Sequence, residues 1–336
     1  MLALSDDIQD VVLLWIGRIG DLLISTPAVA AVRGKFPAAR ITLITGEQGI
    51  AAARLIPDVD EVRVLGRFHR PLANLALTAG LAARRADLLI DLNPSFSRSA
   101  WMLARLASAR VKIAFRKKHG NGAFSHLLEA PGEKEHMLDR YGRLAQAIDA
   151  PYAPTPRIRL TEADRRAAAA ALRAIGAPAA ARLVGIFPGN FKKRENRWPR
   201  EKFAAFAGRL QEMDGLFPFF MAGPGETAAV QDVAARLNRP LPVLEALPLG
   251  AAAALLRELH IFAGNCTGTT HLAIAAGAPT FSLLSRYTQT VWMPRPSGAA
   301  PHFCAVAEDW ESCRDIPVET ALAAFRDALS ALRCRG

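Results

Sequence analysis

The chain of 336 residues has no long hydrophobic run. Its uninterrupted apolar stretches are short, such as Val11–Ile16, whereas a membrane-spanning helix needs roughly 18 apolar residues. The first ten residues contain three Asp and neither Lys nor Arg, although a secretory signal needs a basic start before its apolar run. We therefore expect neither a membrane-spanning helix nor a signal peptide.

Cysteine and aromatic residues are also scarce. No two of the four cysteines form a Cys-x-x-Cys pair, and in a chain of this length that favours reduced thiols in the cytosol over a disulfide scaffold or a zinc site. Aromatic residues make up 7% of the chain, and no zinc-finger or RNP motif occurs, so we do not expect nucleic-acid binding. The cysteines are Cys266, Cys304, Cys313 and Cys334.

Acidic residues are outnumbered by basic ones. The chain has 42 Lys and Arg against 31 Asp and Glu, a net charge of +11. Residues 1–160 carry 22 basic and 15 acidic groups, a net charge of +7, so the first half is the more basic one. Such a surface can attract an anionic substrate or membrane; alternatively, it is the ordinary solvated surface of an Arg-rich chain.

Short apolar runs alternate with helix-like segments twice, on either side of a Pro-rich linker at residues 150–160. This alternation is typical of parallel sheets covered by helices, and the length fits two domains at roughly 150 residues each. We therefore predict an α/β protein with two doubly wound sheets that face a cleft. The expected strands include 11–16, 40–45, 61–65, 87–92, 111–115, 183–187, 216–222 and 279–284, and the expected helices include 22–35, 48–55, 98–107, 133–148, 162–175, 200–213, 227–237 and 318–332.

The first candidate motif is Gly17-Arg-Ile-Gly-Asp-Leu-Leu23, directly after the first predicted strand. A carboxylate at the carboxyl end of a strand is well placed to act as a general base, which makes Asp21 the informative residue. Alternatively, Asp21 is a first-turn residue favoured by the helix dipole. No Gly-x-Gly-x-x-Gly motif is present, so the sequence gives little support to a dehydrogenase.

Three further motifs fall in the second half, each between a predicted strand and a helix. The basic loop Pro188–Pro199 could grip a diphosphate and stabilise a departing nucleotide, the turn Gly223–Glu226 could hold ribose hydroxyls with its carboxylate, and the segment Asn265–His271 could cradle phosphate at a helix N-terminus. The alternatives are a solvated loop, an ordinary helix start and a buried structural histidine at His271.

One further motif matches a metal-binding pattern, but it lies between Ile56-Pro57 and a predicted strand, where a turn is expected. Asp58-Val-Asp60 has the Asp-x-Asp form that binds a metal and a sugar nucleotide in one glycosyltransferase architecture, yet its position here predicts a turn. Without a metal motif, helix termini and cationic side chains would have to stabilise the negative charge of a diphosphate.

Taken together, these segments resemble glycosyltransferase family 9, the ADP-heptose:lipopolysaccharide heptosyltransferases. The likeness covers nearly the whole chain, and Cys304, Cys313 and Ile316-Pro317 resemble the family's C-terminal tail. Four motifs carry it: Arg18-Ile-Gly-Asp-Leu-Leu with Thr26-Pro27-Ala28, Pro188-Gly189 with Arg197-Trp198-Pro199, Gly223 to Glu226, and Thr267-Gly268 with His271-Leu272-Ala273.

This resemblance implies a GT-B fold and a metal-independent, inverting transfer from ADP-heptose to an anionic lipid-linked core saccharide, with no cofactor. The expected location is cytoplasmic and peripheral, at the inner face of the cytoplasmic membrane. Residues 1–155 would bind the acceptor, residues 156–316 the nucleotide sugar, and the helix in 317–336 would cross back to the first domain. Asp21 falls on the family's catalytic base, Glu226 on its ribose-binding acid, and Thr267, Gly268 and His271 on its phosphate loop.

The candidate catalytic residues are thus Asp21 and Arg197. The candidate nucleotide-sugar residues are Pro188, Gly189, Asn190, Lys192, Lys193, Asn196, Gly223, Glu226, Cys266, Thr267, Gly268, Thr269 and His271.

Two departures from the family pattern fall on the donor side. Cys266 stands where the family usually has Asp, and Asn196 where it usually has Lys. They leave open which sugar is transferred, and either Arg197 or a nearby Lys could stabilise the leaving diphosphate. The alternatives are a nucleotide-sugar epimerase of the same fold and a catalytically weakened binding protein of the assembly pathway.

Overall fold

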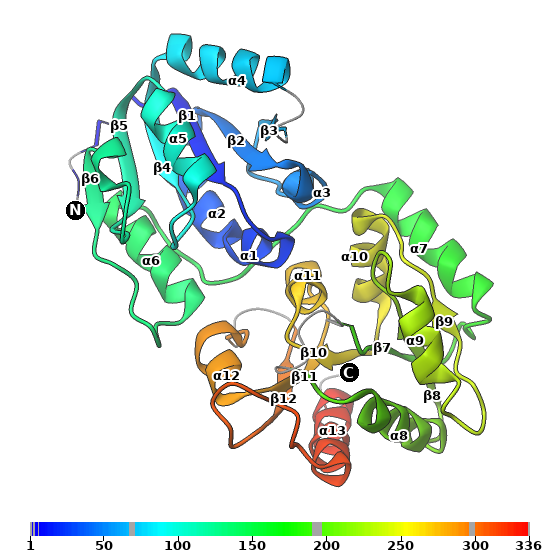
Figure 1. Ribbon diagram of the computed structural model, residues 1–336. Coiled ribbons are helices and arrows are strands. Elements are labelled where there is room, and N and C mark those ends of the chain that lie inside the picture. The colour runs from blue at the N-terminus through cyan, green and yellow to red at the C-terminus, as the bar shows by residue number, and fades with distance from the viewer. Residues whose placement is uncertain are drawn as a thin grey trace. The chain divides into compact units, whose positions relative to one another are not determined.

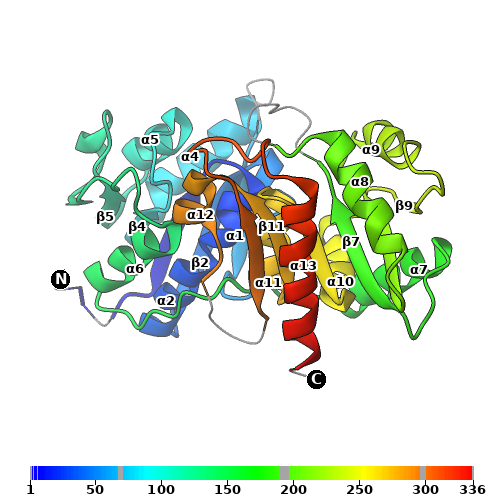
Figure 2. The ribbon, with the colours of Figure 1, turned by 90° about the horizontal axis from the view of Figure 1, so that it is seen from below.

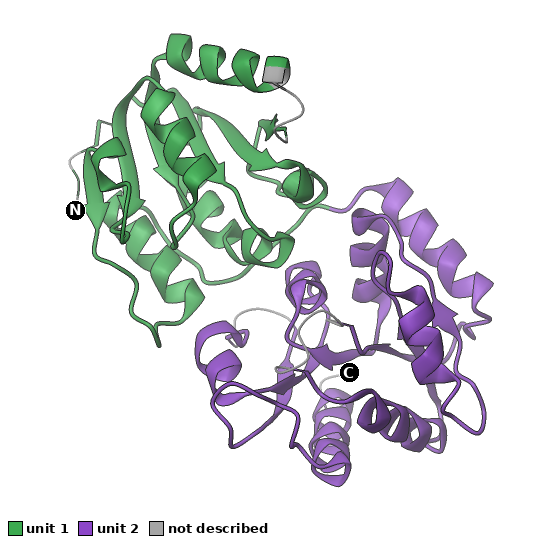
Figure 3. Ribbon diagram, in the orientation of Figure 1, with its two compact units in different colours: residues 1–159 green, residues 160–336 purple. Residues whose placement is uncertain are grey.

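The computed structural model describes residues 2, 4–5, 7–66, 71–189, 197–295 and 300–334, except for the side chains of residues 71 and 73. The chain divides into two compact units, residues 1–159 and 160–336 (Figure 3). The border falls after Arg159, inside the Pro-rich segment in which we expected the linker. Each unit contains a six-stranded sheet in which all paired strands run parallel.

The first sheet has the strand order β3-β2-β1-β4-β5-β6 (Figure 1). The helix α4 packs against α5 and β3, α5 also packs against β4, and α2 packs against α6. The strands are β1 (Asp10–Trp15), β2 (Arg40–Gly46), β3 (Glu61–Leu65), β4 (Ala86–Asp91), β5 (Ala109–Phe115) and β6 (His126–Leu128). The helices are α1 (Ile19–Ile24), α2 (Thr26–Lys35), η1 (Glu47–Gly49), α3 (Ile50–Ala53), α4 (Pro71–Arg84), α5 (Arg98–Leu106), η2 (Asn121–Ala123) and α6 (Met137–Ala147).

The second sheet has the order β12-β11-β10-β7-β8-β9. The last helix, α13, packs against α8, β11 and β12 (Figure 2); its predicted return to the first domain stays a prediction. The strands are β7 (Arg182–Phe187), β8 (Leu216–Met221), β9 (Val243–Leu244), β10 (Ile261–Asn265), β11 (Thr280–Leu284) and β12 (His302–Val306). The helices are α7 (Glu162–Ala174), α8 (Arg200–Gln211), α9 (Thr227–Ala234), α10 (Leu249–Glu258), α11 (Gly268–Ala276), α12 (Arg286–Trp292) and α13 (Val318–Arg333).

The predicted helix 22–35 is two helices rather than one. It breaks at Ser25, whose hydroxyl donates to the Leu22 carbonyl at 2.7 Å. Pro27 follows in the first turn of α2, where a residue without an N–H is tolerated. Because the first helix begins at Ile19, Asp21 lies in its first turn rather than in a loop.

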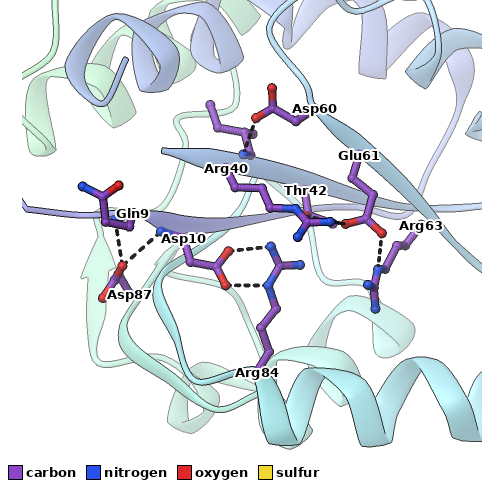
Figure 4. A network of polar contacts seen from close by, with 10 residues as sticks. Gln9, Asp10, Arg40, Thr42, Asp60, Glu61, Arg63, Arg84 and Asp87 are labelled. Carbon is purple, nitrogen blue, oxygen red and sulfur yellow. Dashed lines mark hydrogen bonds and ion pairs between the residues drawn. The ribbon is translucent and has the colours of Figure 1, made fainter. Parts of the chain in front are cut away.

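Ion pairs tie the amino-terminal edge of the first sheet together (Figure 4). Arg84, the last residue of α4, donates twice to the carboxylate of Asp10 at 2.5 Å. Arg40 and Arg63 donate to the carboxylate of Glu61 at 2.9 and 2.7 Å. Burial alone would raise the pKa of Glu61, but these two guanidinium groups lower it below its ordinary value. The ion pair between Arg84 and Asp10 therefore fixes the C-terminal end of α4 to the sheet.

Stacked and edge-on aromatic rings fill the core between the second sheet and α8 and α13. The ring of Phe206 is 5.8 Å from that of Trp198 and 6.2 Å from that of Phe281, measured between centroids, and all three side chains are fully buried. Such aromatic pairs contribute about 0.5–1.5 kcal/mol each beyond the area they bury.

At the far edge of the same sheet, His302 begins β12, and its Nδ1 lies 3.0 Å from the Thr280 hydroxyl. Burial lowers the pKa of His302 to about 4, because the charged imidazolium loses its hydration there.

Candidate functional site

Each sheet has one topological switch point, where the chain changes the direction in which it adds strands. In the first sheet it lies between β1 and β4, and in the second between β7 and β10. Ligands of open parallel sheets bind outside the carboxyl ends of the strands at such points. The motifs predicted from sequence follow β1, β7, β8 and β10, so they lie at these two edges.

Asp21 lies at the edge of the first sheet, in α1, and its side chain is half-buried. The phenol of Tyr141, in α6, interacts electrostatically with Asp21. Burial raises the pKa of Tyr141 well above its ordinary value, and the negative charges of Asp21 and Asp91 raise it further. Tyr141 therefore stays protonated and cannot act as a base at neutral pH.

A buried ion pair at the same edge was missed by sequence reasoning. Lys117, just after β5, donates to the carboxylate of Asp91 at 2.5 Å, and the two side chains are 5% and 1% exposed. The side-chain amide of Asn93 donates to the same carboxylate at 2.6 Å. Asn93 Oδ1 in turn accepts from the N–H of Ile16 at 3.2 Å. This network holds the segment that leads from β1 towards Asp21.

The network also distinguishes the carboxyl groups at this edge. Asp91 is buried and occupied by Lys117 and Asn93, so a substrate cannot reach it. Asp21 and Glu47 are the half-buried carboxyl residues here. The signal that could have found Asp91 is its place at the end of β4, directly beside β1 across the switch point.

A pocket of about 430 Å³ opens at the carboxyl edge of the first sheet. The side chain of Asn74 holds one wall, because it accepts from the N–H of Gly66 at 2.8 Å and donates to the Gly66 carbonyl at 3.0 Å. The pocket is lined by the segments that follow β1, β2 and β3 and by residues of α4 and α5, namely Ile16, Gly17, Arg18, Gly46, Glu47, Gln48, Leu65, Gly66, Asn74, Ser99 and Met102.

In the second unit, the structure brings Gly189, Gly223 and Glu226 together. A Cβ added to Gly189 would lie 2.8 Å from Glu226 Oε2 and 2.4 Å from the ring of Phe187, and one added to Gly223 would lie 2.7 Å from Glu226 Oε2. The carboxylate thus lies over two backbone segments that only glycine leaves open. Gly225 adopts φ +76° in the turn between β8 and α9, a conformation that favours glycine. Pro188, next to Gly189, is buried.

The fourth motif surrounds the N-terminus of α11. Thr267 is the N-cap, and Gly268 at the first helical position is exposed. Cys266 and Thr269 are half-buried beside them. The first helical N–H groups have no partner within a helix and carry its positive dipole end, so this turn suits a phosphate group.

His271 is only 6% exposed, and its ring lies 5.7 Å from that of Trp292. This agrees with the buried histidine that position alone favoured, and its predicted contact with phosphate stays a prediction.

Asn265 connects the second motif to the fourth. Its Oδ1 accepts from the N–H of Trp198 at 3.0 Å and from the thiol of Cys313 at 3.6 Å. Trp198 Nε1 donates to the Ile316 carbonyl at 2.8 Å. With 1% exposure and its oxygen occupied, Asn265 cannot replace an acceptor lost at Cys266. Arg197, next to Trp198, is half-buried.

Four candidates of the basic loop lie outside the described residues: Asn190, Lys192, Lys193 and Asn196. Asp58-Val-Asp60 lies in a turn, as predicted, where Asp58 pairs with Arg157 at 2.8 Å and Asp60 accepts from the N–H of Ile41 at 2.7 Å. Within the described ranges, no cluster of three or more His, Cys, Asp or Glu side chains is placed to hold a metal ion.

Two other sequence expectations concern helices and thiols. Among the described helices, none combines the length and the apolar character that crossing a bilayer requires. The four cysteines, all in described segments, form no disulfide.

Comparison with known proteins assigns this chain to a family. The model of glycosyltransferase family 9 (heptosyltransferase) matches residues 74–314. Lipopolysaccharide heptosyltransferase 3 of Escherichia coli is 23% identical over 299 residues, which cover 82% of this chain and 83% of that protein.

Solved structures show the same fold. A family 9 glycosyltransferase from Veillonella parvula superposes with a TM-score of 0.85 at 20% identity. The superposition covers 97% of this chain and 100% of that one. The ADP-heptose lipopolysaccharide heptosyltransferase II of E. coli gives a TM-score of 0.78 at 17% identity, with coverage of 97% and 100%. Together with the two parallel sheets, these confirm the α/β GT-B architecture. Because the family model covers most of the chain, this protein belongs to glycosyltransferase family 9, the heptosyltransferase family.

Proposed function

We propose that this protein transfers a heptose or a related sugar from an ADP-sugar to an anionic, lipid-linked lipopolysaccharide core acceptor, with inversion at the anomeric carbon and with Asp21 as general base. Membership of the family supports the reaction class. The names of its relatives, a lipopolysaccharide heptosyltransferase and an ADP-heptose-dependent one, support the donor and the acceptor. We propose that the first unit binds the acceptor and the second binds the nucleotide sugar, at the inner face of the cytoplasmic membrane.

The observation that carries the role of Asp21 is its contrast with Asp91. Asp21 follows β1 and Asp91 ends β4, the two strands at the switch point of the first sheet, but Asp91 is 1% exposed and paired with Lys117, whereas Asp21 is half-buried. A base must reach the proton that it removes. Asp21 therefore takes the proton of the acceptor hydroxyl as its oxygen attacks the anomeric carbon. The bond from that carbon to the diphosphate oxygen breaks in the same step, and ADP leaves with the electron pair.

The second unit holds the leaving group. The N–H groups at the start of α11, beside Thr267 and Gly268, face the negative charge that grows on the diphosphate. Arg197 adds a cationic side chain, and no metal ion takes part. The carboxylate of Glu226, over Gly189 and Gly223, accepts hydrogen bonds from the ribose hydroxyls.

The test compares Asp21→Asn with Glu47→Gln, since both carboxyl groups lie at the same sheet edge and are half-buried. We expect Asp21→Asn to lower kcat by about 10²–10⁴-fold, with ADP affinity unchanged because the nucleotide binds to the other unit. We expect Glu47→Gln to keep kcat within about tenfold of wild type. The reverse pattern, or Asp21→Asn within about threefold of wild type, would refute Asp21 as the base.

The same assay separates the alternative functions when it is run with and without the lipid-linked acceptor. Release of ADP that depends on acceptor supports transfer. Isomerisation of the donor without acceptor would instead indicate an epimerase, and tight binding without turnover would indicate a binding protein.

A further inference from the structure

Among the residues of α4 whose side chains the structure describes, no exposed one is charged or polar. Every exposed residue of this helix whose side chain is described is Leu or Ala, and Leu72 and Leu75 are 79% and 64% exposed. An apolar helix face is normally buried against a core or in a membrane. The exposed residues are Leu72, Leu75, Ala76, Ala79, Ala82 and Ala83.

The neighbouring helix α5 extends this apolar surface and adds positive charge. The two helices pack against each other, and α5 exposes Met102 and Leu106 together with Arg98 and Arg105. Of the six large hydrophobic residues that are exposed in the described chain, five belong to α4, to α5 or to the connection before α5. We call this surface the α4–α5 face; its large residues are Leu72, Leu75, Phe96, Met102 and Leu106, and its cations are Arg98 and Arg105.

Loose attachment of α4 does not explain the exposure. The inner residues Leu77 and Leu81 are buried in the core. At one end of the helix Asn74 is bonded to Gly66, and at the other Arg84 is bonded to Asp10. The leucines therefore point outward from a helix that is fixed at both ends.

The charge around this face favours an anionic partner. From residue 71 to residue 106 the acidic residues are Asp87 and Asp91. Asp91 is buried against Lys117, and Asp87 accepts from the N–H groups of Gln9 and Asp10 at the opposite edge of the sheet. The exposed arginines of α5 thus have no acidic residue of α4 or α5 beside them. Two copies packed through this face would bring like charges together, which disfavours self-association.

The α4–α5 face is continuous with the pocket of the first unit, because Asn74 and Met102 belong to α4 and α5 and also line that pocket. We propose that this face docks on an anionic lipid bilayer, with Leu72 and Leu75 in the boundary between headgroups and acyl chains and Arg98 and Arg105 at lipid phosphates. The benefit for catalysis rests on the proposed function, since docking would bring the pocket to the headgroup of a lipid-linked acceptor.

The experiment measures flotation of the full chain with vesicles of phosphatidylglycerol and phosphatidylethanolamine. We expect wild type to float, and to float less at high salt because the arginine contribution is screened. The double variant Leu72→Gln/Leu75→Gln should lose about tenfold or more in partitioning, because two leucines no longer leave water. The variant Arg98→Gln/Arg105→Gln should lose about tenfold or more on these vesicles and little on neutral phosphatidylcholine vesicles.

Matched controls lie on the second unit. Trp310→Gln removes the one exposed large hydrophobic residue of the described chain that is outside the face, and Arg166→Gln/Arg173→Gln removes two exposed arginines of α7. Both controls should float like wild type. Failure of wild type to float, or equal losses in the controls, would overturn the proposal. So would a dimer that the leucine variants dissociate while flotation stays unchanged.

A second readout separates this proposal from the proposed function. A water-soluble acceptor saccharide without acyl chains should be turned over equally by wild type and by Leu72→Gln/Leu75→Gln. If the leucine variant lost turnover of that acceptor as well, its substitutions would have damaged the pocket, and the docking role would be overturned. If wild type floated but turned over no sugar, the proposed function would fail and the docking face would stand.

Discussion

Removing the ammonium group of Lys117 tests how much the buried ion pair at the edge of the first sheet contributes to the stability of the first unit. The carboxylate of Asp91 is 1% exposed and accepts from Lys117 at 2.5 Å and from Asn93 at 2.6 and 3.0 Å. In Lys117→Met an unbranched apolar side chain replaces the stem of the lysine, but Asp91 is left as a buried charge without its counter-ion. Such losses cost about 3–5 kcal/mol. For a unit of this size each kcal/mol lowers Tm by about 2–4 °C, so we expect a fall of about 6–20 °C.

The assay must report on the first unit alone, because two units need not unfold together. Calorimetry gives the transition, and hydrogen exchange of peptides from β1 and β4 assigns it to the first sheet. A second variant, Asp91→Asn combined with Lys117→Met, should recover much of the loss, since the amide oxygen still accepts from Asn93 and no charge remains buried. A Tm for Lys117→Met within about 2 °C of wild type would refute the reasoning, as would a double variant no more stable than the single one.

Three other predictions concern the second unit. Glu226→Gln should weaken ADP binding by about 1–3 kcal/mol, measured by calorimetry, because the ribose hydroxyls lose a charged acceptor; unchanged affinity would contradict this role. Cys266→Asp should raise turnover of ADP-heptose relative to other nucleotide sugars, since a thiol is a weak acceptor and a carboxylate a strong one; no gain, with wild type already preferring ADP-heptose, would contradict an altered donor. The pKa of His302 is about 4 when folded and about 6.5 when unfolded, so the unfolded state binds more protons between these values, and stability should fall by about 3 kcal/mol as pH drops from 6.5 to 4. His302→Gln should flatten this pH dependence of Tm, whereas the exposed His119→Gln should leave it as in wild type.

Much of the fold could be predicted because each unit repeats one simple pattern of short apolar runs and amphipathic helices. Residues 11–16, 40–45 and 61–65 are β1, β2 and β3 to within one residue at either end. The helix α4 was missed because its sequence is Leu- and Ala-rich on both faces, and periodicity detects a helix only when one face is polar. The short edge strands β6 and β9 were missed because two or three residues give no alternation.

The place of a candidate residue relative to the strands was predictable where one local segment carries the motif, whereas its role stays a prediction. The Thr267–His271 turn begins just after β10, and Asp21 lies in the first helix after β1; the observed strand order places both segments at the switch points. Asp91 and Lys117 could not be paired from sequence, because 26 residues separate them and their contact depends on the register of β4 against β5. The position of Glu226 over Gly189 likewise depends on β7 and β8 lying side by side.

The contact of Glu226 with two glycines restricts how this part of the protein can change. An alanine at position 223 would place its Cβ 2.7 Å from the carboxylate oxygen, so the acid would have to leave its present position. An alanine at position 189 would lie 2.8 Å from the same oxygen and 2.4 Å from the ring of Phe187, so that ring would have to move as well. A shorter residue at position 226 would relieve the first overlap, but it would also remove the proposed ribose contact. Substitutions here are therefore epistatic: the effect of a larger residue at position 189 or 223 depends on the side chains at positions 226 and 187.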